Sequence, residues 1–540
     1  GGGGGGGGAT VRAAKRRATS RARNSVPKFF VTTAIDYANG EPHLGHAFEK
    51  IGADAIARYH RLRGDDVWLL IGMDEHGQKV AQTAAERGLS PEELTDRIAA
   101  SFQAMWQRLA ISYDQFIRTS TAEHRAGVRE LLLRIFEHNL DDFYERSYQG
   151  WYCVGCEAFK QDAEIVDGKC VLHPTRTLEW VEERNWFFRL SRYRDFLLEH
   201  IEAHPEFIEP VTRRNEIVSL LRQGLEDISA SRSRFSWGVP FPKPTSDGEQ
   251  QTTYVWFDAL PNYYTASRFP GSRATWPAQL HIIGKDITRF HCVIWPAMLE
   301  AAKLPLPERV FAHGFVNLGG ERFSKSAGVR LDLGEAVDRF GPDAFRYFLL
   351  REVPFDADGN FSWERFEERY IADLANAFGN LASRTIAMLE KYCGGVVPAF
   401  DPVSLAAAAS WVAPEEVRYA EAMGGQLLHE ALAAAWRIVA RANEYVDRQA
   451  PWKLAKAPEQ RPELEITLAA LAYTLARVAL LVWPFMPSKA EQLWEQLGAP
   501  GTIGGSVQAG TDLLARPVNP SAWHVTKGAP LFPRPQAPVA

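Results

Sequence analysis

The chain has 540 residues, which is more than a single hydrophobic core supports, so we expect several domains. Its 61 basic and 66 acidic side chains give a formal net charge of −5, which excludes a polycation that binds nucleic acid through bulk charge. Five cysteines in this length exclude a disulfide scaffold and suit a reducing compartment.

Residues 1–27 begin with eight glycines and continue into an Arg- and Ser-rich stretch, with no acidic residue before Asp36. We expect a disordered N-terminal extension here. An Arg-rich stretch without acids is also typical of an organelle transit peptide, but oligoglycine is not part of that pattern. We therefore expect a cytoplasmic protein, with an organelle matrix as the alternative.

Residues 28–140 are predicted to form the first half of an α/β domain. The run KFFVTT (28–33) is β-rich, residues 46–64 have helical spacing, and DVWLLIG (66–72) reads as a second buried strand. A strand, helix and strand in this order require a parallel sheet. In such sheets ligands bind where the strands end and the helices begin.

A cysteine-bearing segment at 141–213 interrupts this pattern, and we predict that it is an insertion. Sheet-like runs return in 214–330, at 252–261, 280–286 and 309–320, so we expect the second half of the α/β domain there.

Residues 331–370 are predicted to form a connecting stem, 371–520 an all-α domain, and 521–540 a C-terminal tail. The helical domain has an apolar stripe at Ile371, Leu374, Phe378, Leu381, Thr385 and Met388. The most apolar run of the chain, 468–486, has an arginine at its middle, so we predict a buried core helix and no membrane partner.

The tetrapeptide HLGH places His43 and His46 three residues apart at the start of a predicted helix. Both side chains would then point to one side, near free backbone N–H groups and the positive end of the helix dipole. Gly45 leaves room for a flat ring to approach. The pattern favours an anion pocket, although a purely structural histidine pair remains open, and a metal would need a third ligand.

The segment ERFSKS (321–326) carries Arg322 and Lys325 between Ser324 and Ser326. A basic loop of this kind suits charge stabilisation on a phosphate group during transfer. A solvated basic loop without function is the alternative.

Cys153, Cys156, Cys170 and His173 have the spacing C-x2-C-x13-C-x2-H. Two ligand pairs at this spacing predict a Cys3His zinc site, against the alternative of scattered reduced cysteines. Four protein ligands leave no open position, so the zinc is expected to be structural.

These motifs together resemble a known family. HLGH resembles the HIGH signature of class I aminoacyl-tRNA synthetases, and RFSKS resembles their KMSKS loop. Blocks similar to those of methionyl-tRNA synthetases follow in the family's order, from Lys28 to LFPRP (531–535). They are DYANGEPHLGH (36–46), GMDEHG (72–77), TTYVWFDALPNYY (252–264), GKDITRFHCVIWPAMLEA (284–301), NLASR (380–384) and YVDRQAPW (445–452).

The resemblance implies a Rossmann-like parallel-sheet catalytic domain split by a zinc-binding insertion, followed by an all-α anticodon-binding domain. It implies activation of L-methionine with ATP and Mg2+, and transfer of the aminoacyl group to the 3′-terminal ribose of tRNA(Met), the initiator included. His43, His46, Arg322 and Lys325 then match the catalytic positions. The ATP-binding positions match His43, Gly45, His46, Ser324, Lys325 and Ser326.

The same resemblance assigns two further sets of residues. The methionine-binding positions match Ile35, Tyr37, Asp74, Trp256, Tyr263 and His291, with Asp74 as ligand of the amino group. The anticodon-reading positions match Asn380, Arg384 and Trp452, and stacking on tryptophan is a common way to read an unstacked RNA base. We expect a monomer, because the resemblance shows no appended dimerising domain.

The chain departs from the family pattern at two motifs. Arg322 and Phe323 replace Lys and Met in the KMSKS-like loop, and Arg322 keeps the charge but not the point geometry of lysine. Asp36 stands where many relatives have an uncharged residue. Two alternatives remain at this stage: another HxGH-type nucleotidyltransferase, and a non-catalytic RNA-binding zinc protein derived from a synthetase.

Overall fold

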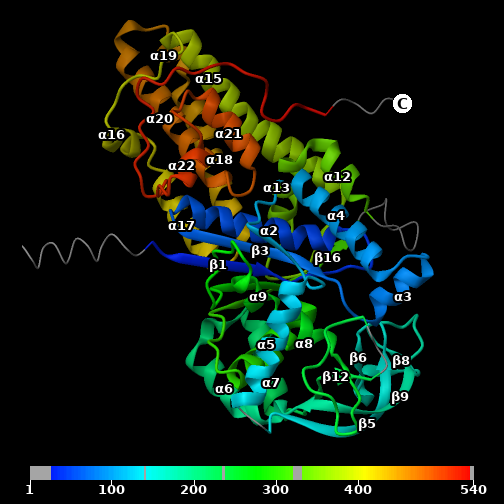
Figure 1. The fold of residues 1–540 in the computed structure, drawn as a ribbon. Helices are drawn as coiled ribbons and strands as arrows, with labels where there is room; N and C mark the ends of the chain where they lie inside the picture. The colour runs from blue at the N-terminus through cyan, green and yellow to red at the C-terminus, as the bar shows by residue number, and fades with distance from the viewer. Residues whose placement is uncertain (1–25, 139–140, 234–236, 320–330, 536–540) are drawn as a thin grey trace, which may run out of the picture.

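A parallel sheet lies at the middle of the molecule, between a helical domain at one end and an antiparallel sheet at the other (Figure 1). The computed structural model describes residues 26–138, 141–233, 237–319 and 331–535, except for the side chain of Tyr148. The disordered extension predicted for residues 1–27 therefore falls almost wholly outside the described residues.

The central sheet has seven described strands in the order β10-β15-β14-β1-β3-β2, with β4 also paired to β3. Every pairing in it is parallel, as the strand–helix–strand pattern predicts. The strands are β1 (Lys28–Thr33), β2 (Asp36–Tyr37), β3 (Asp66–Asp74), β4 (Gln115–Arg118), β10 (Ile208–Glu209), β14 (Leu280–Gly284) and β15 (Val310–His313).

The two faces of the sheet belong to two different cores, because successive side chains of a strand point to opposite faces. On β1, Val31 joins a core with helix α2 (Leu44–Leu62), whereas Phe30 joins a core with helix α5 (Ala122–His138). The first core also contains α3 (Gln78–Glu86) and α4 (Pro91–Arg108), and the second contains α9 (Asn262–Thr265) and α10 (Trp295–Ala301).

The insertion is built on a long antiparallel pair, β5 (Phe143–Cys153) and β9 (Glu179–Phe188), flanked by β6 (Ala158–Phe159) and β11 (Ile228–Ser229). The short pair β7 (Ile165–Val166) and β8 (Lys169–Cys170) lies at its tip. Helices α6 (Arg194–Ala203) and α7 (Val211–Arg222) follow.

The insertion and the α/β domain interleave where the sequence analysis draws a boundary at residue 213. Strand β10, before that boundary, pairs with β15 of the central sheet, and β11, after it, pairs with β9 of the insertion. A boundary read from composition marks one point along the chain, whereas the two sheets exchange strands across it.

The sheet-like prediction for 252–261 is largely wrong. Only β13 (Thr252–Thr253) is a strand, paired with β12 (Ser231–Arg232), and α8 (Val255–Ala259) follows at once. Tyr254, Val255 and Phe257 are all buried in the second core. A short apolar run buried on every side has no periodicity that separates strand from helix.

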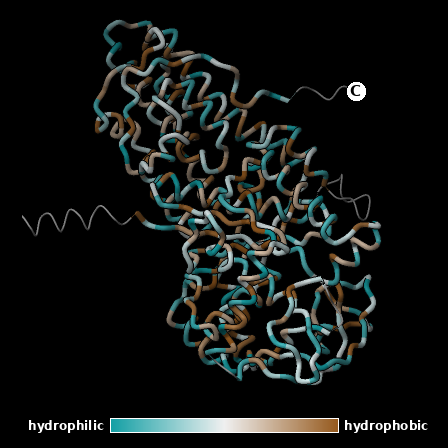
Figure 2. The backbone as a smooth tube through the Cα atoms, viewed as in Figure 1, coloured by the Kyte–Doolittle hydropathy of each residue, from teal (hydrophilic) through white to brown (hydrophobic). Residues whose placement is uncertain are grey.

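The helical domain confirms the prediction for the C-terminal part of the chain, and apolar and polar segments alternate along its helices (Figure 2). The predicted stem at 331–370 is also helical and contains α12 (Leu333–Phe340), α13 (Pro342–Glu352) and α14 (Trp363–Arg369). The helical domain contains α15 (Asn380–Cys393), α16 (Pro402–Ala408), α17 (Val412–Gly424), α18 (Leu428–Gln449), α19 (Pro451–Leu454), α20 (Arg461–Val482), α21 (Pro487–Gln496) and α22 (Ile503–Gln508). Residues Tyr370–Gly379 form a π-helix, so the expected stripe starts on a wider turn.

Helix α20 is the apolar run that the sequence analysis assigns to the core. The segment Pro458–Val482 is long and apolar enough to cross a membrane, yet 83 % of its most apolar window is buried inside the protein. Arg477 of this helix forms a bidentate ion pair with Glu416 of α17, with N–O distances of 2.6 and 2.8 Å. The burial and the paired arginine are those of a core helix.

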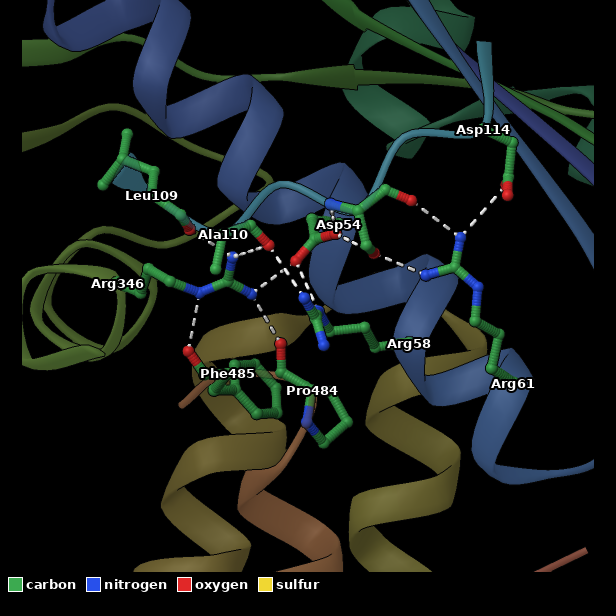
Figure 3. Close-up of polar contacts among 10 residues, drawn as sticks. Asp54, Arg58, Arg61, Leu109, Ala110, Asp114, Arg346, Pro484 and Phe485 are labelled. Atoms are coloured by element: carbon green, nitrogen blue, oxygen red, sulfur yellow. Dashed lines mark hydrogen bonds and ion pairs between the residues drawn. The ribbon is translucent and has the colours of Figure 1, made fainter. Parts of the chain in front are cut away.

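Arg346 of α13 joins the α/β domain to the helical domain (Figure 3). Its side chain is completely buried. It forms an ion pair of 2.7 Å with Asp54 of α2 and donates to the carbonyl oxygens of Leu109, Ala110, Pro484 and Phe485. All five N–H groups of the guanidinium are thereby used. One side chain thus ties α2, the end of α4 and the segment between α20 and α21.

Candidate active site and metal cluster

The two histidines of HLGH cap the helix that follows them. His43 is the N-cap of α2, and its Nδ1 accepts from the backbone N–H of Gly45 at 3.1 Å. His46 Nδ1 accepts from the backbone N–H of His43, also at 3.1 Å. The two rings are stacked with centroids 3.6 Å apart. The prediction that both point to one side is right, but these two backbone N–H groups are not free.

Burial, together with the neighbouring His43, lowers the pKa of His46 well below its usual value. His46 is therefore neutral near pH 7 and offers a hydrogen bond rather than a charge. Each ring already uses its Nδ1 for the cap, and Nε2 of His46 lies 3.9 Å from Asp36 Oδ1. Among the described residues, the group with metal-ligand spacing lies in the insertion and not here.

A buried ionic network lies directly behind the histidines. Lys50 of α2 is completely buried and contacts carboxylate oxygens of Asp36 at 3.0 Å and Glu49 at 2.9 Å. His313, at the end of β15, contacts Glu49 at 2.9 Å. Burial raises the pKa of Asp36 to about 7, whereas Lys50 and His313 outweigh burial at Glu49 and hold its pKa at about 2. Asp36, which departs from the family pattern, therefore has a buried cation as its partner.

Asp74 ends strand β3, in register beside Tyr37 of β2. Its side chain is buried, and Oδ1 has no hydrogen-bond partner among the described residues. Burial, reinforced by Asp258 and Glu157, raises the pKa of Asp74 well above its usual value. A buried carboxylate oxygen without a partner is costly, so this position favours a ligand that carries a cation.

Aromatic side chains build a wall near this carboxylate. The hydroxyl of Tyr263 lies 2.6 Å from His291 Nε2, and His291 Nδ1 lies 3.0 Å from the carbonyl oxygen of Ile287. Burial lowers the pKa of His291 to about 4, so the ring is neutral, and its Nδ1–H donates to the carbonyl. Trp256 is stacked on Phe290 at 3.8 Å.

Five of the six predicted methionine-pocket residues fall into two groups. Tyr37 and Asp74 are neighbours in the sheet, and the rings of Trp256 and Tyr263 both contact the ring of His291. The sixth, Ile35, packs against the same core as Trp256. A cavity of about 80 Å³ lies between the catalytic domain and the insertion. Gly77, Tyr152, Glu157, Trp237 and Tyr254 are part of its lining, and none of the six predicted residues is.

The four predicted metal ligands converge at the tip of the insertion. Their donor atoms all lie within 4.8 Å of one another. Cys156 Sγ lies 3.6 Å from Cys170 Sγ and 3.2 Å from His173 Nδ1. Ligand bonds of the usual zinc lengths in a tetrahedron place donors about 3.5–3.8 Å apart, so the cluster fits such an ion. A Cβ on Gly155 would lie 2.5 Å from the His173 ring, so the loop needs glycine there.

The three predicted anticodon residues lie in the helical domain, far from the insertion (Figure 1). Asn380 and Arg384 are exposed on α15, and Trp452 of α19 has an exposed fraction of 39 %. The guanidinium of Arg384 lies 5.9 Å from the centroid of the Trp452 ring. This exposure is not that of a core residue.

The KMSKS-like residues Arg322, Ser324, Lys325 and Ser326 lie outside the described residues. The described chain on one side of them, β16 (Val316–Leu318), contacts α2, the helix that starts with the two histidines. Their placement therefore stays a prediction.

Sequence reasoning missed a buried cluster behind the pocket. His76 and His124 hold the two oxygens of Asp258 at 2.5 and 3.0 Å, and together they keep the pKa of Asp258 at about 2 despite burial. It also missed Glu157, whose carboxylate accepts from the Tyr37 hydroxyl. Both sets join segments more than a hundred residues apart, so spacing along the chain does not indicate these contacts. The motifs GMDEHG, which contains His76, and CxxCE, which ends with Glu157, mark the residues but not their partners.

Comparisons with known proteins agree with this geometry. A family profile described as "tRNA synthetases class I (M)" matches residues 29–177 and 163–386. The methionine--tRNA ligase of Rhizobium meliloti (strain 1021) is 44% identical over 526 residues, 95% of this chain and 99% of the relative. That of Streptomyces coelicolor (strain ATCC BAA-471 / A3(2) / M145) is 40% identical over 542 residues, 96% of this chain and 98% of the relative.

Solved structures agree as well. Mycobacterium tuberculosis methionyl-tRNA synthetase in complex with methionyl-adenylate superimposes with a TM-score of 0.85 at 40% identity, covering 94% of this chain and 100% of that one. Its apo form superimposes with a TM-score of 0.81 at 38% identity, covering 96% and 100%.

Proposed function

The chain belongs to the methionyl-tRNA synthetases of class I, and we propose how its residues divide the two steps of the reaction. In the first step, a carboxylate oxygen of L-methionine attacks the α-phosphorus of ATP. The bond from the α-phosphorus to the oxygen that bridges it to the β-phosphate breaks, and diphosphate leaves. In the second step, a hydroxyl of the terminal tRNA ribose attacks the carbonyl carbon of the adenylate, and AMP leaves.

The amino group of methionine is proposed to bind Asp74. The supporting observation is the buried Oδ1 that has no partner, which an ammonium group satisfies by hydrogen bond and charge. The same contact lowers the raised pKa of this carboxyl, so binding and ionisation favour each other. This observation carries the choice of an α-amino acid over a substrate without a cationic group.

The side chain of methionine is proposed to pack between Trp256 and the neutral pair of Tyr263 and His291. Aromatic rings contact a polarizable thioether favourably. The neutral His291, with Nδ1–H bound to a carbonyl, supports an apolar pocket, because a charged imidazole would oppose it. Ile35 and Tyr37 would complete the wall.

ATP is proposed to lie at the start of α2. His46, neutral and held by the cap, would donate from Nε2 to a phosphate oxygen, and Gly45 would let the nucleotide approach the backbone. Lys325, with Arg322, would stabilise the charge that develops during transfer, and Mg2+ would accompany the phosphates. Preorganised donors of this type act mainly on the transition state.

The tRNA is proposed to bind the helical domain through its anticodon. The exposed Trp452 ring beside Arg384 supports stacking of a base, with Asn380 reading an edge. A site that reads the anticodon treats initiator and elongator tRNA(Met) alike, because the two share it. We therefore propose that both are charged.

The Cys3His cluster is proposed to hold one structural zinc ion. Its donor spacing and the room left by Gly155 support this assignment. When bound, zinc supplies a cross-link between the two loops of the insertion rather than a reacting group, because four protein donors leave no open position. Thiolate ligands also fit a reducing compartment, and we propose the cytoplasm as the place of action.

The test is ATP–diphosphate exchange with each of the twenty amino acids. We expect exchange with methionine alone, and a much higher KM for methionine in Asp74→Asn. Asp66→Asn is the matched control, since Asp66 starts the same strand and its side chain is 42% exposed. Exchange that depends on no amino acid would favour the alternative of another HxGH nucleotidyltransferase. Exchange with none and binding of tRNA would favour a non-catalytic protein.

A further inference from the structure

Helix α3 starts without a cap of its own. Its N-cap is Gly77, which directly follows the motif GMDEH and has no side chain to accept from the first N–H groups. The acceptor comes from the insertion instead: Glu157 Oε1 accepts from the backbone N–H of Lys79 at 3.2 Å. A Cβ on Gly77 would lie 2.1 Å from that oxygen, so the glycine is what lets the carboxylate reach the helix.

The other oxygen of Glu157 accepts from the hydroxyl of Tyr37. The carboxylate therefore bridges two parts of the catalytic domain, the start of α3 and Tyr37 of β2. Tyr37 lies in register with Asp74. The side chain of Glu157 is almost fully buried, so water does not compete strongly for these two contacts.

The backbone of Glu157 is set by the metal cluster. The residue directly follows Cys156 and has a φ of 52°, in the left-handed region that residues other than glycine rarely adopt. Its N–H donates to the carbonyl oxygen of Val154, which closes the turn between the first two ligands. The turn that carries Cys153 and Cys156 thus directs the Glu157 side chain out of the insertion and into the catalytic domain.

We propose that Glu157 is a positioning residue for methionine binding: delivered by the loop of the metal cluster, its carboxylate holds the Tyr37 ring in the wall of the amino-acid pocket. This role rests on the proposed function, in which Tyr37 lines that pocket. A ring held in its binding position loses less freedom when the ligand arrives, so the anchor raises affinity for methionine. Glu157 touches no reacting atom, so the rate of adenylate formation at saturation should not depend on it.

The test compares Glu157→Ala with Glu157→Gln. The alanine variant removes both contacts. The glutamine variant can keep both, because its carbonyl oxygen accepts from Lys79 N–H while its NH2 donates to the phenol oxygen of Tyr37. The control is Glu164→Ala, a carboxylate of the same insertion whose side chain is 41% exposed and pairs with Lys160. Methionine-dependent exchange gives KM and kcat, equilibrium dialysis gives methionine binding without turnover, and elemental analysis gives the zinc content.

We expect Glu157→Ala to raise the KM and the dissociation constant for methionine about threefold to tenfold, with kcat unchanged. This is the effect of losing one hydrogen bond, the one that holds the Tyr37 hydroxyl. Glu157→Gln should recover most of the loss, and Glu164→Ala should match the wild type. In a Tyr37→Phe background, which already lacks the hydroxyl, Glu157→Ala should add little.

Three results would overturn the positioning role. They are an unchanged methionine affinity in Glu157→Ala, a full additional loss in the Tyr37→Phe background, and a loss of zinc in Glu157→Ala, which would make the effect one of the cluster itself. A wild-type enzyme with no methionine-dependent exchange would instead reject the proposed function. Failure of the inference and failure of the function are therefore distinguishable.

Discussion

Replacement of Arg346 by methionine tests whether one buried side chain holds the two domains together. The guanidinium makes an ion pair with Asp54 and donates to four carbonyl oxygens while fully buried (Figure 3). Methionine has similar length but no donor. Asp54 would keep Arg58 and Ser112 as partners, whereas the carbonyl oxygens of Leu109, Pro484 and Phe485 would lose the donor seen here.

Removal of one partner from a buried ion pair typically costs about 3–5 kcal/mol. The remaining partners of Asp54 reduce that figure, and the three carbonyl oxygens add to it at about 1–3 kcal/mol each unless water enters. We therefore expect Arg346→Met to lower the free energy of unfolding by at least about 3 kcal/mol. The stability that is lost should be that of the contact between α2 and the segment that joins α20 to α21.

The assay is urea unfolding at equilibrium, followed by circular dichroism and, in parallel, by methionine-dependent exchange. The matched control is Arg365→Met of α14. Arg365 makes ion pairs with Glu352 and Glu368 but is 46% exposed, so its loss should cost at most about 1 kcal/mol. If the two variants unfold at the same urea concentration, the reasoning about burial is refuted. If the circular dichroism signal falls at a lower urea concentration than the exchange activity, the helical domain unfolds first.

Four further outcomes are expected. Trp452→Ala should raise the KM for tRNA by about one to two decades and leave methionine-dependent exchange and the melting temperature nearly unchanged; equal losses in both half-reactions would refute base stacking. Lys325→Ala should lower kcat for exchange by a factor that corresponds to about 2–4 kcal/mol, and a rise in the KM for methionine at unchanged kcat would contradict its role. Elemental analysis should find one zinc per chain, and Cys170→Ser should lose the zinc and have a lower melting temperature. A fully active protein that contains no zinc, although it was purified without chelator, would exclude the site. Burial holds the pKa of His291 at about 4, below its unfolded value of 6.5, so the unfolded state binds the extra proton as pH falls and stability falls with it. When the pH falls from 7 to 5, the free energy of unfolding of His291→Gln should therefore decrease by about 2 kcal/mol less than that of the wild type. Equal decreases of the two proteins in urea unfolding would refute this assignment.

Local features of the chain could be predicted from the sequence because neighbours along the chain decide them. The spacing C-x2-C-x13-C-x2-H places four ligands on two tight loops, and the structure brings their donor atoms together. His43 and His46 lie at a helix start and face one side, as their separation of three residues requires. The parallel sheet follows from strand, helix and strand in that order.

Tertiary structure decided the features that depend on long-range contacts. The apolar run at 252–261 contains helix α8 (Val255–Ala259), and its burial on nearly every side leaves no periodicity that would separate helix from strand. One local detail was also missed: the imidazoles of His46 and His43 cap α2 and so occupy the backbone N–H groups of His43 and Gly45. A pattern of residue types indicates which groups are present but not which partner each one finds.

The same distinction separates the two halves of the active site. Asp74 and Tyr37 could be assigned from the motifs around them, but that Asp74 Oδ1 lacks a partner is visible only when every neighbour is in place. Glu157 and Arg346 act on residues 120 and 292 positions away in the chain, the separations 157 − 37 and 346 − 54. The sequence determined the chemistry of the groups, and the packing of distant segments decided which of them meet, because burial and desolvation are properties of the assembled fold.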